Sequence, residues 1–392
     1  MEDAFAISVL ALALVPAALF AVNSVVFRSP GDPGAGGASA SGLGAGPRDQ
    51  ASPAREDDSL PLPAVAILIP ARDEAHSIAG ALEAAATTRG VEFEIVVLDD
   101  HSTDGTPDIV RGFSDRDPRI RLEHSRPLPE GWCGKQHACA QLAERARYDL
   151  LCFIDADVRL TPDGVARLAG FLRSSGAGLV SAVPRQITVT LLEKLLIPLI
   201  HFFMLGYLPI PAMRRSVSPS LAAGCGQLFL AERQAYVQAG GHAAIRASLH
   251  DGLTLPRAFR HAGLRTDICD GTSLATCRMY RNASEVWKGL LKNAHEGVGS
   301  AQLIGVFTVL LIGGCILPFL LPLLGAPGPL SIAAMSAAWF PRLVGVVRFR
   351  DSVLGALLHP LSILVFLAVQ WTSFLLRLAG RKPAAWKGRA YY

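Results

Sequence analysis

The central part of the chain alternates short apolar runs with stretches that have the spacing of helices. Helical stretches at 76–87 and 136–147 lie between apolar runs, several of which end in polar or acidic residues. Strands that alternate with helices favour a mostly parallel sheet covered by helices on both faces. The pattern therefore predicts an α/β fold for one large domain over residues 64–300. The apolar runs are 65–69, 93–98, 120–123 and 150–154.

Longer apolar stretches lie at both ends of the chain. Residues 5–27 are almost continuously apolar, and about 20 such residues cross the hydrocarbon core of a membrane as a helix. A cleaved signal peptide is the alternative, but no Lys or Arg precedes the run and the run is too long for one. We therefore expect a membrane anchor over residues 1–27 and a group of membrane helices over residues 301–378. The apolar stretches of that group are about 305–324, 329–347 and 353–376.

Basic residues indicate how these helices are oriented. Only Glu2 and Asp3 precede the first apolar stretch, and several arginines follow it. Because short cytoplasmic segments are enriched in Lys and Arg, we expect the N-terminus outside and the central domain in the cytoplasm. The basic tail at 379–392 would then lie outside if all four stretches crossed. Either one stretch is re-entrant or the last one bends back at Pro360, and the sequence leaves both open.

Two segments are expected to connect the membrane helices with the central domain. Residues 28–63 are rich in Gly, Ala, Ser and Pro, a composition that buries little apolar surface, so we expect a flexible linker there. Residues 191–213 are strongly apolar but contain Pro198, Pro209 and Pro211. These prolines, and a position inside the central domain, favour a helix at the membrane interface over a spanning helix. Such a helix would bring a hydrophobic molecule to the rim of the sheet.

Composition agrees with a membrane-bound protein and argues against a nucleic-acid partner. Hydrophobic residues make up 51% of the 392 residues and charged residues only 18%, below the share of about 25% that is usual in soluble domains. The net charge of +4 is small, and the basic residues form no block of the kind that binds nucleic acid. The seven cysteines contain no CxxC pair, so we expect reduced thiols with a packing role.

Polar and acidic clusters follow three of the predicted strands, at 70–74, 99–100 and 155–157. In open α/β sheets ligands bind beyond the carboxyl ends of the strands, so these clusters are expected at one rim. Asp155 and Asp157 offer the oxygen ligands that Mg²⁺ or Mn²⁺ takes together with substrate phosphates. A cation there would stabilise the charge on the departing diphosphate of a nucleotide-sugar. The alternative is a solvated acidic turn. Asp99 or Asp100 would accept hydrogen bonds from the nucleoside.

Three further charged residues could serve such a site. Lys135 follows two glycines in a loop before a helix and could place a positive charge on a phosphate, although an ordinary surface lysine is the alternative. Asp251 could act as a general base that takes a proton from an acceptor, although the sequence alone favours a helix cap. Arg278 lies shortly before the second apolar stretch, where it could meet the diphosphate or lipid headgroups.

The segment 65–297 resembles the family 2 glycosyltransferases. Residues 70–74 look like the family's opening motif, with Asp73 where Asn is usual, while 99–105 and 155–157 look like its nucleotide and metal motifs. The resemblance implies a GT-A fold that binds a nucleotide-sugar and a divalent cation, Mg²⁺ or Mn²⁺. The residues expected to bind the nucleotide-sugar are Pro70, Ala71, Arg72, Glu74, Asp99, Asp100, Lys135, Asp155 and Arg278; those expected to bind the metal are Asp157 and Asp155; and the expected catalytic residue is Asp251.

A narrower resemblance extends over nearly the whole chain. The motifs at 131–139, 240–242, 278–280, 359–361 and 386–391 are similar to those of bacterial carotenoid-acid glycosyltransferases and hopanoid-associated glycosyltransferases. They imply inverting transfer of a hexose from a nucleotide-sugar, with uridine diphosphate-glucose as the expected donor. The implied acceptor is hydrophobic and lipid-like, such as a carotenoid, a hopanoid or another isoprenoid. The implied location is the inner (plasma) membrane, as a multi-pass protein with a cytoplasmic catalytic domain.

Two departures from the family pattern bear on this interpretation. The base motif often reads Glu-Asp but here is His250-Asp251, and the Gln/Arg-x-x-Arg-Trp motif of processive polysaccharide synthases is only echoed at 278–281. One rival function is a polyprenyl-phosphate sugar transferase or a polysaccharide synthase of the same fold. A rival from another class is a membrane-bound binding protein that is catalytically inactive. The intact acidic residues at the strand ends argue against this rival.

Overall fold

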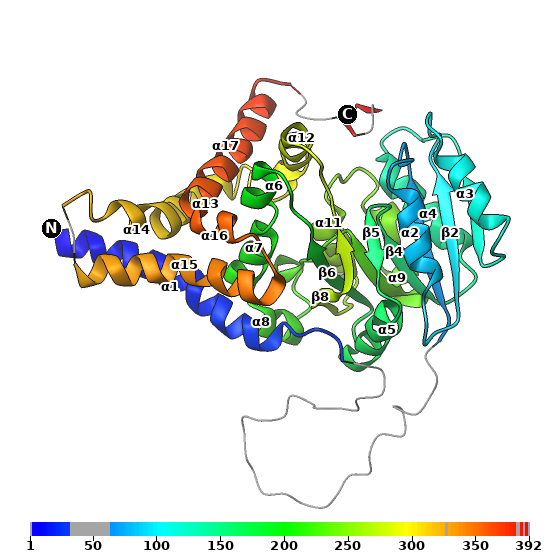
Figure 1. The fold of residues 1–392 in the computed structure, drawn as a ribbon, viewed down its shortest axis with the longest axis horizontal. Helices are drawn as coiled ribbons and strands as arrows, with labels where there is room; N and C mark the ends of the chain where they lie inside the picture. The colour runs from blue at the N-terminus through cyan, green and yellow to red at the C-terminus, as the bar shows by residue number, and fades with distance from the viewer. Residues whose placement is uncertain (1, 32–62, 326–327, 382–384, 387–388, 391–392) are drawn as a thin grey trace, which may run out of the picture.

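The computed structural model describes residues 2–31, 63–325, 328–381, 385–386 and 389–390, and its central domain contains one large sheet (Figure 1). The sheet has eight strands in the order β3-β2-β1-β4-β7-β6-β8-β5. The expected α/β fold is therefore confirmed. The strands are β1 (Val65–Ala71), β2 (Phe93–Asp99), β3 (Ile120–His124), β4 (Leu150–Ile154), β5 (Val158–Leu160), β6 (Leu179–Gln186), β7 (Leu228–Glu232) and β8 (Thr266–Cys277).

The sheet combines parallel and antiparallel pairs. β1 pairs in parallel with β2 and β4, β2 with β3, and β6 with β8. β7 runs antiparallel to β4 and β6, and β5 runs antiparallel to β8, so the whole sheet is mixed. Because β7 starts beside the end of β4 and runs back along it, residues 224–227 lie next to Asp155. The Asp155 N–H donates a hydrogen bond to Gln227 O at 3.2 Å.

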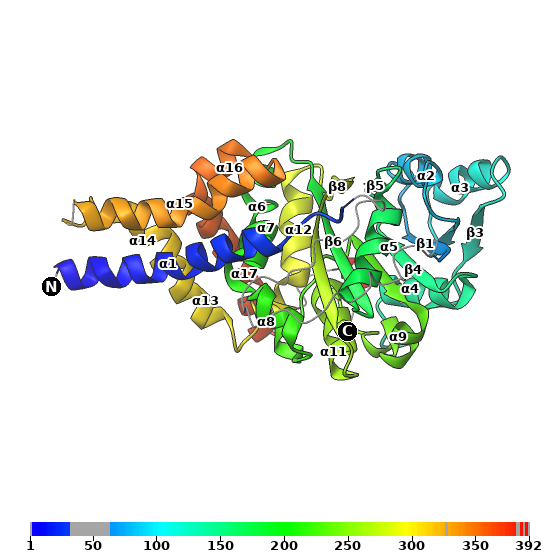
Figure 2. The same ribbon diagram turned by 90° about the horizontal axis from the view of Figure 1, so that it is seen from below.

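Helices cover both faces of the sheet (Figures 1 and 2). Successive residues of a strand point to opposite faces. Ile67 and Ile69 of β1 accordingly pack with α2, α3 and α5, whereas Ala66 and Leu68 pack with α4, α9 and α11. Burial on both faces explains why the strands read as continuous apolar runs. The covering helices are α2 (Ile78–Ala86), α3 (Thr106–Ser114), α4 (Gly134–Arg145), α5 (Gly164–Ser175), α9 (Arg233–Gln238), α10 (Gly241–Ala244) and α11 (Asp251–His261).

The apolar segment 191–213 forms three short helices between the sheet and the long apolar helices (Figure 2). Pro198 and Pro209 lie at the two junctions, because a proline interrupts the hydrogen bonding of a helix. A capping box starts the first of the three, with the Thr190 N–H donating to Glu193 Oε1 at 3.3 Å. The helices are α6 (Leu191–Leu196), α7 (Leu199–Tyr207) and α8 (Ile210–Arg215).

The apolar stretches at both ends of the chain form helices. Three of them are long and apolar enough to cross a membrane, and a shorter apolar segment at 304–320 contains a π-helical turn at 312–316. The N- and C-terminal candidate spans expected from the sequence are therefore present. The three long helices are α1 (Glu2–Val26), α15 (Pro329–Phe349) and α17 (His359–Leu378), and the other C-terminal elements are α12 (Ala283–Asn293), α13 (Ile304–Leu311), α14 (Leu317–Leu320), α16 (Val353–Leu357), β9 (Ala385–Trp386) and β10 (Arg389–Ala390).

Helix α1 is bound to the central domain by buried hydrogen bonds. Asn23 Nδ2 donates to Leu205 O at 2.7 Å and to Leu208 O at 2.6 Å, and its Oδ1 accepts from Ile210 N at 3.3 Å. These three backbone groups belong to the break between α7 and α8, where no helical partner is available to them. Arg348 of α15 adds hydrogen bonds to carbonyl oxygens at the end of α1. The first helix is thus part of the folded body of the protein.

Replacing Asn23 by leucine is expected to destabilise the protein. The substitution leaves two carbonyl oxygens and one N–H buried without a partner, and each such group costs about 1–3 kcal/mol. We expect the midpoint of thermal unfolding in detergent to fall by about 5 °C or more. The control is Val22→Leu in the same helix, where the side chain is 52% exposed. Equal midpoints for the two variants would contradict a stabilising role for Asn23.

Only residues 28–31 and 63 of the expected flexible linker belong to the described part of the chain. Arg28 O accepts a hydrogen bond from Asp270 N at 3.0 Å, and Pro30 O accepts one from Arg167 at 2.8 Å. Residues 28–31 therefore run along the end of the central domain next to β8. The rest of the expected linker, 32–62, lies outside the described residues.

The cysteines agree with a packing role. All seven are buried and none forms a disulfide. Cys152 lies in β4 and Cys269 in β8, where both contribute to the cores around the sheet.

Candidate active site

Hydrogen bonds join the loops that follow β1 and β2. Asp73 has a φ angle of 50°, a conformation that Asn and Asp adopt more readily than other residues with a side chain. Its carboxylate accepts from Thr103 N at 2.7 Å, and its N–H donates to Ser102 Oγ at 2.9 Å. An oxygen acceptor at this position is what the geometry requires. Asp73 therefore preserves the interaction that an asparagine side-chain oxygen would make.

The expected nucleotide-binding residues at these two strand ends lie close together. Asp100 N donates to Ala71 O at 2.8 Å, and an Arg72 guanidinium N–H donates to Asp100 O at 2.6 Å. Asp99 is 5% and Asp100 is 1% exposed. The Glu74 N–H donates to Thr106 Oγ1 at 2.8 Å and holds the first loop against the start of α3. The carboxyl ends of β1 and β2 thus form one rigid edge with acidic side chains.

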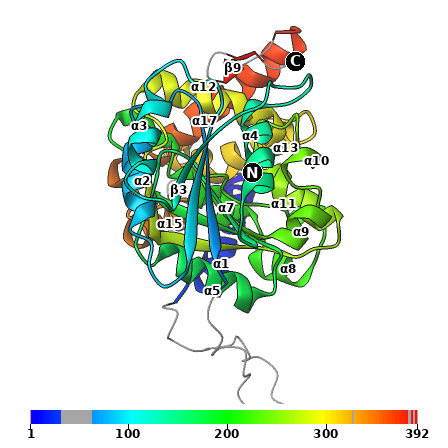
Figure 3. The same cartoon turned by 90° about the vertical axis from the view of Figure 1, so that its right-hand side faces the viewer.

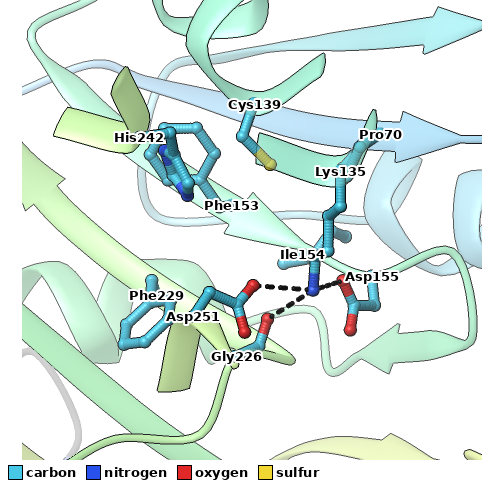
Figure 4. A pocket seen from close by; sticks show the side chains of 10 residues that line it. All are labelled: Pro70, Lys135, Cys139, Phe153, Ile154, Asp155, Gly226, Phe229, His242 and Asp251. Carbon is cyan, nitrogen blue, oxygen red and sulfur yellow. Dashed lines mark hydrogen bonds and ion pairs between the residues drawn. The ribbon is translucent and has the colours of Figure 1, made fainter. Parts of the chain in front are cut away.

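Lys135 joins two carboxylates from distant parts of the chain (Figure 4). Its Nζ lies 2.6 Å from Asp155 Oδ1 and 2.9 Å from Asp251 Oδ2. It also donates to Gly226 O at 3.4 Å. Lys135 stands in the first turn of α4, Asp155 directly follows β4, and Asp251 begins α11. The residues around this small pocket are Pro70, Lys135, Cys139, Phe153, Ile154, Asp155, Gly226, Phe229, His242 and Asp251.

Gly226 allows Asp251 to approach the start of β7. A Cβ atom at this position would overlap the Asp251 carboxylate. Any residue with a side chain would therefore push Asp251 away from Lys135. The reversal of β7 places this glycine in the pocket, which explains why the spacing of residues along the sequence gave no sign of it.

The ion pairs fix the charges in the pocket. Burial would raise the pKa of Asp251, but the nearby Lys135 ammonium outweighs this effect and lowers that pKa. Burial would lower the pKa of Lys135, but Asp155 and Asp251 outweigh it and raise that pKa well above its usual value. Asp251 is therefore ionised and Lys135 positively charged at neutral pH. An ionised carboxylate in a buried pocket is able to accept a proton.

Asp157 has the features expected of a cation ligand. Burial, followed by repulsion from Asp155 and Glu74, raises the pKa of Asp157 to about 7. Among the described residues, its buried Oδ1 has no hydrogen-bond partner. The described part of the chain contains no group of three His, Cys, Asp or Glu side chains arranged to hold a metal by themselves. A cation at Asp157 would therefore need further oxygen ligands from a substrate or from water, as Mg²⁺ commonly does.

Arg278 lies near Asp157 in the fold, but its side chain points to another partner. It follows the last residue of β8, Cys277, which pairs with Val158 next to Asp157. The guanidinium Nε lies 3.6 Å from Glu193 Oε2 on α6. The structure thus places Arg278 between the site and α6, outside the cluster around Lys135.

Two residues near the pocket were not singled out as site residues from the sequence. His242 is buried, its ring lies 4.7 Å from that of Phe153, and its Nδ1 lies 2.8 Å from Tyr236 Oη. Burial lowers the pKa of His242 to about 3, so the ring is neutral. Lys292 on α12 lies close enough to Lys135 that burial and this repulsion lower the pKa of Lys292. His242 falls in the motif at 240–242, but only the positions of His242 and Lys292 in the fold show that they lie near this pocket.

Comparisons with known proteins agree with the fold and the motifs. Residues 66–237 match the family described as glycosyl transferase family 2. The 4,4'-diaponeurosporenoate glycosyltransferase of Staphylococcus haemolyticus is 26% identical over 259 residues, covering 65% of this chain and 68% of that protein. The protein of the same name from Staphylococcus aureus (strain USA300) is 26% identical over 248 residues, covering 61% of this chain and 63% of that protein. The chain therefore spans about two thirds of these relatives.

One solved structure is similar over nearly the whole chain. It is the mannosyltransferase PcManGT from Pyrobaculum calidifontis in complex with GDP-Man and Mn²⁺, with a TM-score of 0.57 and 18% identity. The similarity covers 96% of this chain and 99% of that chain. At this level of identity the similarity concerns the fold, including the helices at both ends.

Proposed function

We propose, from the premise that this chain is a glycosyltransferase with a family 2 domain of the GT-A type, that it transfers one hexose from a nucleotide-sugar to a lipid-like acceptor. The proposed reaction inverts the configuration at the sugar carbon and takes place at the cytoplasmic face of the inner membrane. The observation that carries this proposal is the pocket in which Lys135 joins Asp155 to Asp251, with Asp157 beside it and apolar helices next to the domain.

The donor would lie along the carboxyl ends of β1, β2 and β4. We assign the nucleoside to Asp99 or Asp100, together with the loop at 70–74, and the diphosphate to the region of Lys135 and Asp155. The mannosyltransferase of similar fold was solved with a nucleotide-sugar and Mn²⁺, which supports a donor of this class. Uridine diphosphate-glucose is the donor that the resemblance of the motifs implies.

Asp157, with Asp155, would hold a Mg²⁺ or Mn²⁺ ion. The buried Oδ1 of Asp157 that lacks a hydrogen-bond partner among the described residues fits this role. When bound, such an ion would neutralise charge that develops on the leaving diphosphate. Lys135 supplies a second positive charge on the same side, and Arg278 a third if its contact with Glu193 opens.

Asp251 is the proposed catalytic base. Its lowered pKa keeps it ionised at neutral pH, so it can take a proton from an acceptor hydroxyl. For an acceptor that is already an ionised carboxylate, Asp251 would orient the group instead. Transfer in a single displacement from the opposite face of the sugar gives inversion, and one base in the pocket is sufficient for it.

The acceptor is proposed to come from the membrane. Three helices are long and apolar enough to cross a bilayer, and the short helices α6 to α8 lie between them and the sheet (Figure 2). The curated relatives are named for action on 4,4'-diaponeurosporenoate, a carotenoid acid. This name supports a hydrophobic isoprenoid as the acceptor class.

Product analysis tests the proposal. Membranes that contain the full chain are incubated with labelled nucleotide-sugars and Mn²⁺ or Mg²⁺, and the lipid extract is analysed. We expect one labelled lipid that carries a single sugar, and slower formation of that product in membranes with the Asp251→Asn variant. A labelled polymer or a labelled polyprenyl phosphate would assign the protein to the rival enzymes. Neither transfer nor hydrolysis of any donor in the panel would contradict an enzymatic function.

Metal binding is expected to weaken as the pH falls through 7. A carboxyl group must lose its proton before it binds a metal, and the pKa of Asp157 is raised to about 7. Without a metal ion, the Asp157 carboxyl group is therefore mostly protonated at pH 6 and mostly ionised at pH 8. We expect the Kd for Mn²⁺, measured by electron paramagnetic resonance of the free ion, to be about tenfold higher at pH 6 than at pH 8. The same Kd at both values would contradict Asp157 as the ligand.

A further inference from the structure

We infer that α16 and α17 lie along the membrane surface on the side of the catalytic domain, and that α17 does not cross the bilayer. This inference rests on the membrane location proposed above. By length and composition α17 is a candidate span, so composition alone does not separate the two arrangements. The direction of the helix and the charges at its end favour the arrangement along the surface, and the distribution of its side chains shows which face of the helix meets lipid.

The direction of α17 differs from that of the other apolar helices. Figures 1 and 2 show α1, α13 with α14, and α15 extending along the long axis of the molecule, away from the sheet. In Figure 1 α17 runs across this group of helices. In Figures 1 and 3 its C-terminal end lies near α12, beside the catalytic domain. Helix α17 packs against α6, α12, α13 and the turn at 312–316, and its first half shares a buried cluster with that turn. If the other helices cross the bilayer, α17 lies close to its surface.

The outer face of α17 is apolar and its inner face carries the polar residues. The exposed fractions are 43% for Leu361, 49% for Leu364, 56% for Leu375 and 70% for Leu378. A helix on a soluble domain shows the opposite pattern, with polar residues facing water. The outward face of α17 is therefore suited to lipid. The buried polar side chains of the helix are His359, Ser362, Gln370 and Ser373.

Helix α16 extends this apolar surface toward the catalytic domain. Val353 is 59%, Leu354 is 42% and Leu357 is 55% exposed. Helix α16 contacts α6, where Leu191 at the start of the helix is 56% exposed and Val189 just before it is 52% exposed. Apolar side chains gathered over several elements mark a binding surface. We assign the lipid bilayer as the partner because this surface continues directly from the proposed spanning helices.

Charge at the end of α17 agrees with this position. Arg377 and Arg381 are exposed where the helix ends, and long basic side chains at a membrane surface contact anionic headgroups. With α17 along the surface, the tail stays on the side where Arg348 ends α15. Three crossings, by α1, by the segment 304–320 and by α15, then place the basic segments on one side and the N-terminus on the other. The segment 304–320 has 17 residues, within the range of about 17–25 that spans a bilayer.

Depth measurements test the position of α17 directly. Single cysteines at Leu361, Leu364, Leu375 and Leu378 of the full chain are labelled with a nitroxide in lipid bilayers, and collisions with oxygen and with a water-soluble nickel complex give the depth of each label. The seven native cysteines are buried, so they contribute little label. Because the first half of α17 packs against 312–316, we expect all four labels in the half of the bilayer next to the catalytic domain, with the depth falling steadily from Leu361 to Leu378. Depths that pass through a maximum near the middle of α17 would overturn the inference.

Helix α15 supplies the matched control for this measurement. Labels at Ile332, Leu343 and Val347, which are 66%, 49% and 85% exposed, are expected to differ in depth because the helix crosses the bilayer. Shallow labels at all three positions would contradict the proposed membrane arrangement itself. That result would count against the membrane location and not against the position of α17 relative to α15. The labels on α15 and on α17 therefore separate failure of the proposed membrane arrangement from failure of this inference.

The side on which the tail lies provides a second test. Asp3→Cys, Glu83→Cys and Ala379→Cys each place one cysteine at an exposed position, and a maleimide that does not cross membranes is added to intact cells. We expect Asp3→Cys to react, and Glu83→Cys and Ala379→Cys to react only after permeabilisation. Reaction of Ala379→Cys together with Asp3→Cys would overturn the inference. Reaction of Glu83→Cys and Ala379→Cys but not Asp3→Cys in intact cells would support the inference and contradict the cytoplasmic orientation of the proposed function.

Discussion

Replacing Asp157 by asparagine is expected to lower sugar transfer by about 100-fold or more, with the fold unchanged. The substitution removes a buried carboxylate that has an oxygen without a hydrogen-bond partner among the described residues. A loss of about 3 kcal/mol in stabilisation of the leaving diphosphate corresponds to a rate lower by about 100-fold. The measurement is kcat for transfer to the lipid acceptor in membranes with saturating Mn²⁺, together with the Kd for Mn²⁺.

The control for this variant is Asp108→Asn on α3. The Asp108 side chain is 77% exposed and pairs with Arg111 on the surface, so its loss is expected to leave kcat within about twofold of the wild type. Full activity of Asp157→Asn in the presence of metal would remove Asp157 from the proposed metal site. An equal loss in both variants would show that the assay responds to general damage and would leave no specific role for Asp157.

Replacing Asp251 by asparagine is expected to lower transfer to a hydroxyl acceptor by about 100-fold, because general base catalysis contributes about 10²–10⁴-fold. Lys135 keeps its ion pair with Asp155 at 2.6 Å in this variant, so the pocket retains its positive charge. We therefore expect the Kd for the nucleoside diphosphate to change by less than about threefold. Kinetics with a hydroxyl acceptor and calorimetry with the diphosphate separate the two effects.

The chemical class of the acceptor provides the contrast for this variant. A carboxylic acid is already ionised at neutral pH, so Asp251→Asn is expected to slow transfer to a carboxylate by about tenfold or less. Comparing the two acceptor classes with the same variant distinguishes proton removal from orientation. A hydroxyl acceptor that reacts at the wild-type rate would exclude Asp251 as the base, and a large rise in the Kd for the diphosphate would indicate a role in donor binding.

The strands and their polar ends could be predicted from the sequence because both depend on local patterns. Continuous apolar runs are typical of strands buried on two faces, and β1, β2 and β4 lie where such runs occur. Since parallel strands share the edge at which they end, residues 70–74, 99–100 and 155–157 were expected to be neighbours. The structure brings all three segments to one edge.

The contacts that complete the site could not be predicted, because they join residues far apart in the chain. Lys135 and Asp251 are separated by more than one hundred positions and meet only because β7 returns beside β4. The same reversal brings Gly226 against Asp251. The pairing of Arg278 with Glu193 depends on how α6 packs against the end of β8. None of these contacts leaves a periodic pattern in the sequence.

The break between α7 and α8 shows how one polar residue can alter the role of a segment. In the sequence Asn23 is only a polar interruption in the apolar run 5–27, for which a membrane anchor is the favoured interpretation. In the structure its side chain satisfies three backbone groups of the central domain. The need for these hydrogen bonds arises from Pro209, almost two hundred residues later, which ends the preceding helix.

Asn23 and Arg348 hold α1 against α7, α8 and β8 of the central domain, since Arg348 Nε also lies 3.5 Å from Asp270 Oδ2 on β8. In a bilayer, the height of Asp251 above the lipid would then be constant. Acceptors would be selected by how far their reactive group stands out of the hydrocarbon. A long, rigid molecule anchored deep in the bilayer would present its end group at a defined level, whereas a short analogue that floats at variable depth would seldom meet the sugar.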